Sequence, residues 1–371
     1  MSESDKIKTI TLSDLFLFKN AYEKRTLLSL TLELTHRCNN NCLHCYINIP
    51  ADNREAKEKE LSFKEIKNIM DQAFSMGTLW VLLTGGEPLL RDDFFDIYLY
   101  LKRKGFLVSV FTNASLISDE HIKLFQKYPP RDIEVSVYGV TEKTHKKVTR
   151  NNTFSATMEG IEKLISGHVP VTFKTTLMKS NYREIKQIAG FCEKITKNAF
   201  RFDPFLTLRL DRDNKKNNQI IRERLSAGEI LELDKLDKKR YHAIKEQCRA
   251  VDGMTLKDKG RLFRCRAGIN SVCIDCYGIL KLCSSLMDKK CLYNLQEGSL
   301  EDAWNNFVPG IRMMKSYNTA FRNKCGVCDI TDLCMWCPAH SYLETGKIDE
   351  PVQYFCDTAH KRYFYFHDDM A

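Results

Sequence analysis

Between Ser29 and about Leu208, short apolar and β-branched runs alternate with longer amphipathic segments. The runs lie at residues 29–35, 79–84, 106–112, 132–139, 169–177 and 200–208. Among the intervening segments, one opens with a capping Ser62 and closes at Gly77, and the next closes at Gly105. This alternation is typical of βα units built on a parallel sheet. With right-handed crossovers, the six units predict an α/β fold, a partial (β/α)6 barrel of the TIM type.

The 371-residue chain also contains 15 cysteines. It starts without a basic region followed by a long apolar stretch, and no later run approaches the roughly 18 apolar residues of a membrane span. We therefore expect a cytoplasmic protein with no membrane partner. Because a reducing compartment does not maintain disulfides, the cysteines are expected to bind metal or clusters. Thirteen of them lie at residues 38–45 and 265–356, which predicts two metal-bearing regions, while Cys192 and Cys248 stand alone.

Composition divides the chain into five parts. Residues 1–28 form an N-terminal extension, 29–208 the barrel, 209–262 a charged helical connector that we expect to be solvated, 263–360 a cysteine-rich domain and 361–371 a tail. The formal net charge of +9 suits an acidic ligand or nucleic acid without requiring either. Charge alone therefore does not decide the function.

The first cysteine group, THRCNNNCLHCY, follows the first predicted strand, at the end of the barrel where such folds carry their sites. Its spacing is C-x3-C-x2-C, formed by Cys38, Cys42 and Cys45. Three thiolates on a four-iron cluster leave one iron open to a ligand. The alternative is a zinc site completed by His36 or His44. After the second strand, TGGEP offers paired glycines whose bare backbone can approach a ligand, while Glu87 and the backbone carbonyls can accept from an ammonium group.

The cysteine loop, the aromatic residue after it and the GGEP turn together resemble the radical S-adenosylmethionine (radical SAM) superfamily. The resemblance implies that Cys38, Cys42 and Cys45 hold a [4Fe–4S] cluster whose open iron binds S-adenosylmethionine (SAM). One electron from the cluster then cleaves SAM to methionine and a 5′-deoxyadenosyl radical. The positions that the resemblance assigns to cofactor binding are Tyr46, Gly85, Gly86, Glu87, Pro88, Asn113, Ser136 and Arg150.

The second cysteine group reads Cys265-x12-Gly278-x4-Cys283, then Cys325-x2-Cys328-x5-Cys334-x2-Cys337, then Cys356. By pattern alone, the four cysteines between 325 and 337 suit one tetrahedral zinc site, which leaves the others unexplained. The whole arrangement resembles the SPASM domain of radical SAM enzymes. It departs from the usual pattern by two residues instead of three between Cys334 and Cys337, which puts the local geometry at Cys337 in doubt.

The SPASM resemblance implies one or two auxiliary Fe–S clusters. The first would use Cys265, Cys283 and Cys337, with Cys273 preferred over Cys276 as a fourth ligand. The second would use Cys325, Cys328, Cys334 and Cys356. Cluster binding would supply folding energy to a domain with little core of its own.

The segment from Cys265 to Cys283 is most similar to maturases of pyrroloquinoline quinone precursor peptides, thioether peptides and sulfatases. This similarity implies a peptide or protein substrate that undergoes crosslinking, epimerisation or oxidation. It also implies a reductase such as flavodoxin or ferredoxin, and leaves room for a separate peptide-recognition protein. Dehydrogenation of a small-molecule alcohol is the alternative within the family. A zinc protein that binds nucleic acid is the alternative outside it, but no focused basic stripe supports one, so we expect no nucleic-acid partner.

Overall fold

The computed structural model describes residues 21–198, 200–251 and 260–368. Most of the predicted N-terminal extension, part of the connector and the end of the tail lie outside the described residues.

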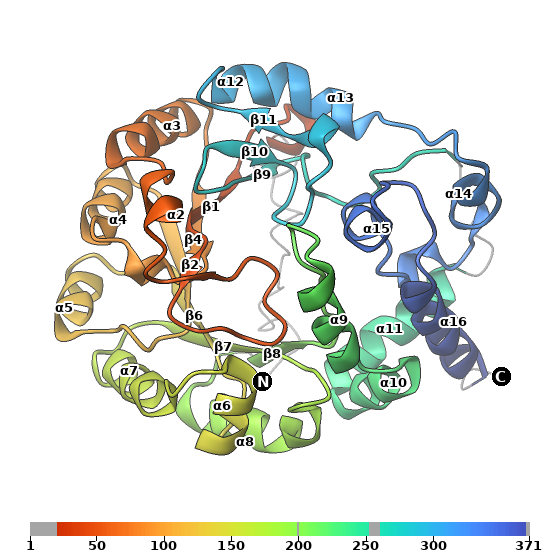
Figure 1. The fold of residues 1–371 in the computed structure, drawn as a ribbon, viewed down its shortest axis with the longest axis horizontal. Helices are drawn as coiled ribbons and strands as arrows, with labels where there is room; N and C mark the ends of the chain where they lie inside the picture. Colours follow the sequence, from red (N-terminus) through yellow and green to blue (C-terminus); the bar gives the residue numbers. More distant parts are fainter. Residues whose placement is uncertain (1–20, 199, 252–259, 369–371) are drawn as a thin grey trace, which may run out of the picture.

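The predicted parallel sheet is confirmed. Its six strands pair in chain order, and they are β1 (Ser29–Thr35), β4 (Trp80–Gly85), β5 (Leu107–Thr112), β6 (Asp132–Ser136), β7 (Val171–Thr176) and β8 (Phe200–Asp203). β8 is shorter than the predicted run because Pro204 follows it, and proline has no N–H for a sheet hydrogen bond. The strands curve into a partial barrel, as Figure 1 shows.

Helices cover the outer face of the curved sheet (Figure 1), and the main ones are α3 (Phe63–Ser75), α4 (Phe94–Arg103), α5 (Asp119–Lys127), α7 (Phe154–Ser166) and α8 (Ile185–Ile195). Two short helices, α2 (Arg54–Glu58) and α6 (Glu142–Thr149), lie in loops at the carboxyl ends of strands. The predicted start of α3 is confirmed, because Ser62 and Glu65 form a reciprocal capping box. Gly77 and Gly105 follow α3 and α4 with φ of +86° and +92°, a conformation that glycine adopts without strain.

The cysteine-rich region extends the barrel sheet. Strand β9 (Ser271–Ile274) pairs in parallel with β1, so that Leu30 faces Val272 and Thr31 faces Cys273. Strands β10 (Ile279–Lys281) and β11 (Tyr293–Asn294) then add antiparallel, giving the order β11-β10-β9-β1-β4-β5-β6-β7-β8. The strands on the two sides of the predicted boundary at residue 262 therefore belong to one sheet.

The connector carries three helices, α9 (Asn214–Glu223), α10 (Ala227–Leu236) and α11 (Lys238–Val251). α10 and α11 pack against α16 (Gln353–Asp368), and Ile230, Leu231 and Leu233 are buried. The expectation of a solvated connector is therefore wrong for α10, because the charged pattern conceals an apolar face. The remaining helices are α12 (Leu300–Asp302), α13 (Val308–Arg312), α14 (Thr319–Asn323) and α15 (Pro338–Thr345).

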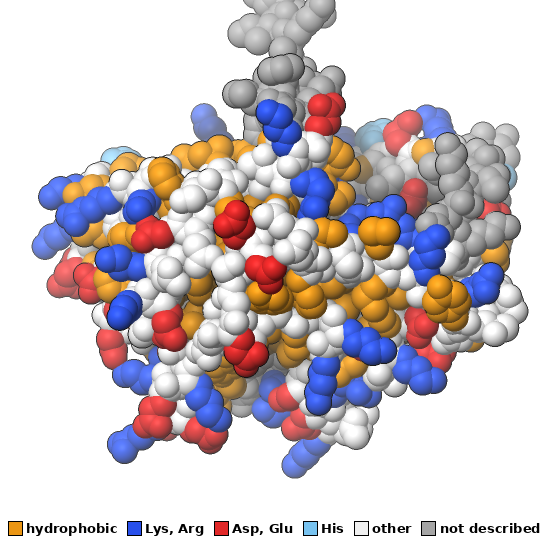
Figure 2. All heavy atoms as spheres, turned by 90° about the horizontal axis from the view of Figure 1, so that it is seen from above, with side chains coloured by type: hydrophobic (Ala, Val, Ile, Leu, Met, Phe, Trp, Pro, Cys, Tyr) orange, Lys and Arg blue, Asp and Glu red, His pale blue; other side chains and the backbone are white. Residues whose placement is uncertain are grey.

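The surface mixes charges of both signs. Figure 2 shows acidic and basic side chains interspersed on one face, with no continuous field of one sign. In the described part of the chain, no helix combines the length and apolar character that crossing a bilayer requires.

A buried charge cluster joins the connector to the last helix. Asp234 of α10 is fully buried and accepts hydrogen bonds from Arg362, with a distance of 2.7 Å from its Oδ2 to Nε, and from Arg240. Asp234→Asn removes the charge that both arginines need, so we expect it to destabilise the protein by about 3–5 kcal/mol. Urea unfolding followed by circular dichroism measures this loss.

The matched control is Glu232→Gln on the same helix, whose carboxylate is exposed and pairs with Lys235. Its unfolding midpoint should equal that of the wild type. Equal midpoints for the two variants would show that the Asp234 cluster does not hold α10 to α16.

Candidate active site

A cavity of about 380 Å³ lies inside the curved sheet and reaches the carboxyl ends of its strands. The loop after β1 contributes all three cysteines of the first group to the cavity wall. Of the positions predicted to bind the cofactor, five line the same cavity: Tyr46, Gly85, Gly86, Asn113 and Ser136. The structure therefore brings together residues that lie up to 98 positions apart in the sequence, from Cys38 to Ser136.

The cysteine loop is held by backbone hydrogen bonds at its start and in its middle. It begins with β2 (Arg37–Cys38) and returns beside this strand as β3 (Ile49–Pro50). Within the loop, the Asn41 and Leu43 amides donate to the carbonyls of Thr149 and Val148, at 2.9 Å each. The end of α6 thus supports the loop from the side.

The three thiols share a desolvated site. Burial, together with the nearby Glu87 carboxylate, raises the pKa of Cys38 to about 12. Burial also raises the pKa of Cys42, with added contributions from the charges of Cys45 and Cys38. Thiolates in such a site need a compensating positive charge, which a metal cluster provides. The donor set therefore fits an iron–sulfur cluster.

No group of three or more His, Cys, Asp or Glu side chains in the described ranges is arranged to hold a single ion. A four-iron cluster is several atoms wide, so its thiolates stand farther apart than the ligands of one zinc ion. Both histidines of the zinc alternative make other contacts in the protein. His36 Nε2 lies 3.2 Å from a carboxylate oxygen of Glu33, and the His44 ring packs edge-on against Tyr138.

The GGEP turn docks on the stem of the cysteine loop. The Gly86 amide donates to the Thr35 carbonyl at 2.7 Å, and the Glu87 amide donates to the Arg37 carbonyl at 2.9 Å. A Cβ added to Gly85 would lie 2.1 Å from the Thr35 oxygen, and one added to Gly86 would lie 2.2 Å from the Arg37 oxygen. The protein backbone itself therefore requires both glycines, although their atoms also line the cavity.

The Glu87 carboxylate points into the protein and not into the cavity. It accepts hydrogen bonds from Thr112 Oγ1 at 2.7 Å and from the Asn113 amide at 2.8 Å, and burial raises its pKa to about 7. In this structure the carboxylate fixes the end of β5, and its contact with a ligand ammonium stays a prediction. Pro88 is buried at the start of a short 3-10 turn behind it.

The other predicted cofactor-binding side chains differ in their surroundings. Asn113 lines the cavity, but its side chain is already hydrogen-bonded within the protein. Its Nδ2 donates to Asn39 Oδ1 at 2.8 Å, and its Oδ1 accepts from the backbone amide of Ser115 at 2.9 Å. Ser136 lines the cavity beside Tyr138. Arg150 caps the end of α6 with φ +53° and donates to Gln219 at 3.1 Å. The structure does not bring Arg150 into the cavity.

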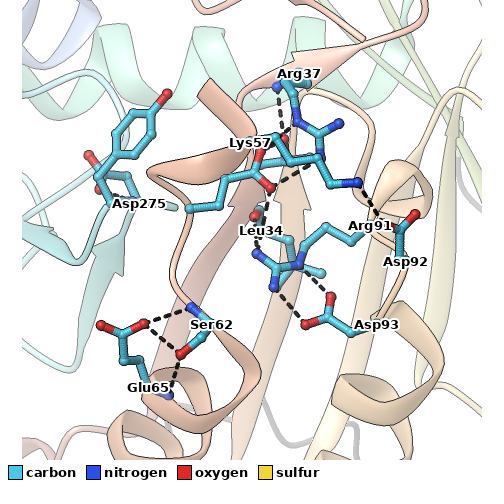
Figure 3. Close-up of polar contacts among 12 residues, drawn as sticks. Leu34, Arg37, Lys57, Ser62, Glu65, Arg91, Asp92, Asp93 and Asp275 are labelled. Atoms are coloured by element: carbon cyan, nitrogen blue, oxygen red, sulfur yellow. Dashed lines mark hydrogen bonds and ion pairs between the residues drawn. The ribbon is translucent and has the colours of Figure 1, made fainter. Parts of the chain in front are cut away.

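A charge network supports the stem of the cysteine loop from behind (Figure 3). Arg37 donates to both oxygens of Glu60, at 2.8 and 3.1 Å. Arg91 donates to both oxygens of Asp93, at 2.7 Å each. Arg91 also donates to the Leu34 carbonyl of β1 at 3.2 Å. Neither arginine was singled out by the motif, because the contacts that tie them to the stem join Arg37 to Glu60, 23 positions away, and Arg91 to Leu34, 57 positions away.

The proposed ligands of the first auxiliary cluster lie near one another. The pKa of Cys283 is raised to about 11, first by burial and then by the neighbouring thiols of Cys337 and Cys265. Cys273 is buried on β9 and has Cys283 among its charged neighbours, although Glu33 and Lys281 act on it more strongly. Cys276 lies instead among Asp275, Glu60 and Glu33. The placement favours Cys273 over Cys276, and its role as a ligand stays a prediction.

The proposed ligands of the second auxiliary cluster line one cavity of about 500 Å³ at the foot of α16. Burial, together with the charges of Cys325, Cys356 and Cys328, raises the pKa of Cys334 to about 12. The four cysteines therefore lie close together around one cavity. Cys337, which completes the simple zinc pattern, does not line this cavity.

Comparison with known proteins identifies the family. The radical SAM superfamily matches residues 32–192, from β1 to α8. A probable GTP 3′,8-cyclase of Saccharolobus solfataricus is 30% identical over 219 residues, which are 58% of this chain and 70% of that protein. The chain belongs to the radical SAM superfamily. An AdoMet-dependent heme synthase of Methanosarcina barkeri is similar over a longer range, 26% identical over 87% of this chain and 94% of that protein.

Two solved structures share the fold of this radical SAM chain. Streptococcus suis SuiB bound to the precursor peptide SuiA superposes with a TM-score of 0.65 at 16% identity, covering 93% of this chain and 83% of SuiB. anSMEcpe with bound AdoMet and the Cp18Cys peptide gives 0.63 at 15% identity, covering 92% and 97%. The similarity extends through the cysteine-rich C-terminal region, as the SPASM resemblance predicts.

The sequence motifs missed several residues of the radical SAM cavity. Lys174 of β7, Tyr138 after β6 and Glu33 of β1 all line it. Lys174 was visible as a lone lysine within the run VPVTFKTTL, where a strand side chain on the inner face of the sheet meets the cavity. Glu33 was visible in the same way within SLTLELT.

The docking of the GGEP turn leads to a first prediction for this site. Gly86→Ala places a methyl group against the Arg37 carbonyl, so the turn must move away from the cysteine loop. We expect a loss of about 1–3 kcal/mol in stability and reduced iron content after anaerobic reconstitution. Thermal unfolding and iron quantitation measure the two effects.

Gly190→Ala on α8 is the matched control, because an added Cβ there meets nothing within 4 Å. It should keep the iron content of the wild type and match or exceed its stability. Normal iron and stability in Gly86→Ala would contradict the docking role of the turn.

A second prediction concerns the four-thiol cavity. Cys325→Ala combined with Cys328→Ala removes two of its sulfurs, so we expect about four fewer irons per chain and lower solubility. Iron quantitation of the soluble, reconstituted protein measures this loss. Cys291→Ala is the control, since Cys291 is buried elsewhere in the same region. A soluble double variant with wild-type iron would refute the second auxiliary site.

Proposed function

We propose that this radical SAM enzyme modifies a peptide or protein substrate. The observation that carries the proposal is the single cavity in which the three thiols of Cys38, Cys42 and Cys45 meet the glycines of the GGEP turn. The peptide is supported by the fold, which is shared with SuiB and anSMEcpe over both the barrel and the C-terminal region. Each of those proteins was solved with a peptide bound.

Within this proposal, Cys38, Cys42 and Cys45 hold a [4Fe–4S] cluster, and the C-terminal thiols hold the auxiliary Fe–S clusters. Cluster and SAM, when bound, supply a 5′-deoxyadenosyl radical able to take hydrogen from an unactivated carbon. The chain's own residues provide the enclosure for this chemistry. Aromatic side chains from the cysteine loop, from β5 and from the segment after β6, namely Tyr46, Phe111 and Tyr138, form walls that exclude water. Ser136 and the backbone of Gly85 and Gly86 offer polar groups to SAM.

A second candidate substrate is a porphyrin-like small molecule. The heme synthase of Methanosarcina barkeri is similar over 94% of its own length, which includes both the barrel and the C-terminal region. The identity of 26% leaves the substrate open. The two candidates differ in a simple assay, since a modified peptide changes its mass or its chromatographic retention, whereas a porphyrin changes its visible spectrum.

Partners follow from the same proposal. A radical SAM enzyme needs one electron for each cleavage of SAM, so we propose a reductase such as flavodoxin or ferredoxin as donor. A separate recognition protein that presents the peptide remains part of the proposal. The interspersed charges in Figure 2 offer no basic stripe on that face for nucleic acid.

The test is anaerobic reconstitution with iron and sulfide, followed by dithionite and SAM. We expect the wild type to form 5′-deoxyadenosine. The triple variant of Cys38, Cys42 and Cys45 to Ala should lose about four irons per chain and all 5′-deoxyadenosine formation, because no thiolate remains to hold the first cluster. Chromatography of the product and iron quantitation measure both.

Cys192→Ala is the control, because this cysteine is buried in α8 away from the cavity. It should retain iron and product. Formation of 5′-deoxyadenosine by the triple variant, or stoichiometric zinc with no product in the wild type, would overturn the proposal. Supplying the active enzyme with precursor peptides encoded beside it, or with iron coproporphyrin, then separates the two substrate candidates.

A further inference from the structure

Lys174 places a positive charge in the wall of the radical SAM cavity. It extends from β7, where it faces Ser136 of β6 across the sheet. Among the described residues that line this cavity, it is the only lysine or arginine, while Glu33 and Asp203 contribute carboxylates. Its Nζ lies 3.6 Å from the centre of the Phe111 ring, which lines the cavity too.

The carboxylate beside Lys174 is already neutralised by another cation. Glu134 Oε1 lies 2.9 Å from Lys174 Nζ, but Arg201 of β8 also donates hydrogen bonds to both Glu134 oxygens, at 2.5 and 2.6 Å. Two cations thus share this carboxylate, so Lys174 does not have a carboxylate partner to itself among its ion pairs in the described residues. Arg201 does not line the cavity, and its side chain is 61% exposed against 29% for Lys174. Lys174 is therefore the cation of this pair that faces the cavity.

We propose that Lys174 binds a carboxylate inside the cavity. An ammonium group has three N–H donors, and Glu134 is the only carboxylate paired with this one in the described part of the chain. A carboxylate ligand would both complete the donors and balance the charge, which an uncharged ligand cannot do. Arg150, the cation expected to meet a SAM carboxylate, instead contacts Gln219 outside the cavity.

The carboxylate has two sources within the proposed function, on which this inference rests. One is the methionyl carboxylate of SAM. The other is a carboxylate of the substrate, such as an acidic side chain, a peptide C-terminus or a propionate. Both need the same chemistry at Lys174, so the experiment must separate them.

The experiment measures how fast Lys174 is acetylated in the anaerobically reconstituted full chain. Limiting acetic anhydride is added without dithionite, and mass spectrometry compares Lys174 with the exposed Lys186. One arm adds SAM or decarboxylated SAM. The other adds glutarate or glutaramide in the presence of saturating SAM. A bound carboxylate should slow acetylation of Lys174 about tenfold or more, relative to the partner compound that lacks the carboxylate.

Protection by SAM but not by decarboxylated SAM assigns the carboxylate to SAM. Additional protection by glutarate but not by glutaramide assigns it to the substrate. Equal acetylation in all arms overturns the proposal. Since no step requires turnover, an enzyme that forms 5′-deoxyadenosine but shows no protection refutes this inference alone, whereas the absence of 5′-deoxyadenosine refutes the proposed function.

Variants provide the second measurement. If SAM is the source, Lys174→Gln should weaken SAM binding about 10- to 100-fold in equilibrium dialysis, and Lys174→Arg should restore part of the loss. Lys186→Gln is the control, because this exposed lysine does not line the cavity and its loss should leave SAM affinity unchanged. If the substrate is the source, all variants should bind SAM equally. Only Lys174→Gln should then lose binding of [14C]glutarate. Equal SAM and glutarate binding in all variants would contradict the proposal.

Discussion

Two backbone hydrogen bonds at the carboxyl end of β1 determine the geometry of the candidate site. They join the amides of Gly86 and Glu87 to the carbonyls of Thr35 and Arg37, at 2.7 and 2.9 Å. Because Cys38 follows directly, the same contacts fix the first thiol relative to the GGEP turn. No side chain fits between the two segments, as the distances of an added Cβ show. The site thus depends on an approach of two backbones that only glycine permits.

The same strand also anchors the C-terminal region. Glu33 of β1 lies 3.4 Å from Lys281 of β10, which lies 3.6 Å from Asp275, and Glu33 and Lys281 are fully buried. A buried ion pair contributes little net stability, but displacement of either partner is costly, so the pair fixes how the β9–β10 hairpin sits on β1. Cys283 follows Lys281 by two residues. The first auxiliary thiols are thereby positioned by the barrel itself.

The sequence predicts the barrel well because each βα unit carries its own signals: apolar strands, the Ser62 cap and the glycines that end helices. It predicts the thiol groups from their spacing. It does not predict that β9 continues the barrel sheet, since pairing with β1 is a contact between segments more than 200 residues apart, from Leu32 to Ser271. Nor does it predict the inward turn of Glu87 or the outward turn of Arg150, because a motif specifies a position in the chain and not the direction of a side chain.

The two thiol regions differ in what holds them before any cluster binds. The loop of Cys38, Cys42 and Cys45 is fixed by backbone bonds to α6 and to the GGEP turn, on a barrel with a continuous core. Cys328 and Cys334 lie instead at the ends of short 3-10 turns, packed on a small apolar cluster that α11 and α16 share. Metal binding stabilises most where the unbound segment is least ordered by its own contacts. If the thiols bind clusters as proposed, the barrel thiols form a site prepared for its cluster, whereas the fold around Cys328 and Cys334 would depend on having one.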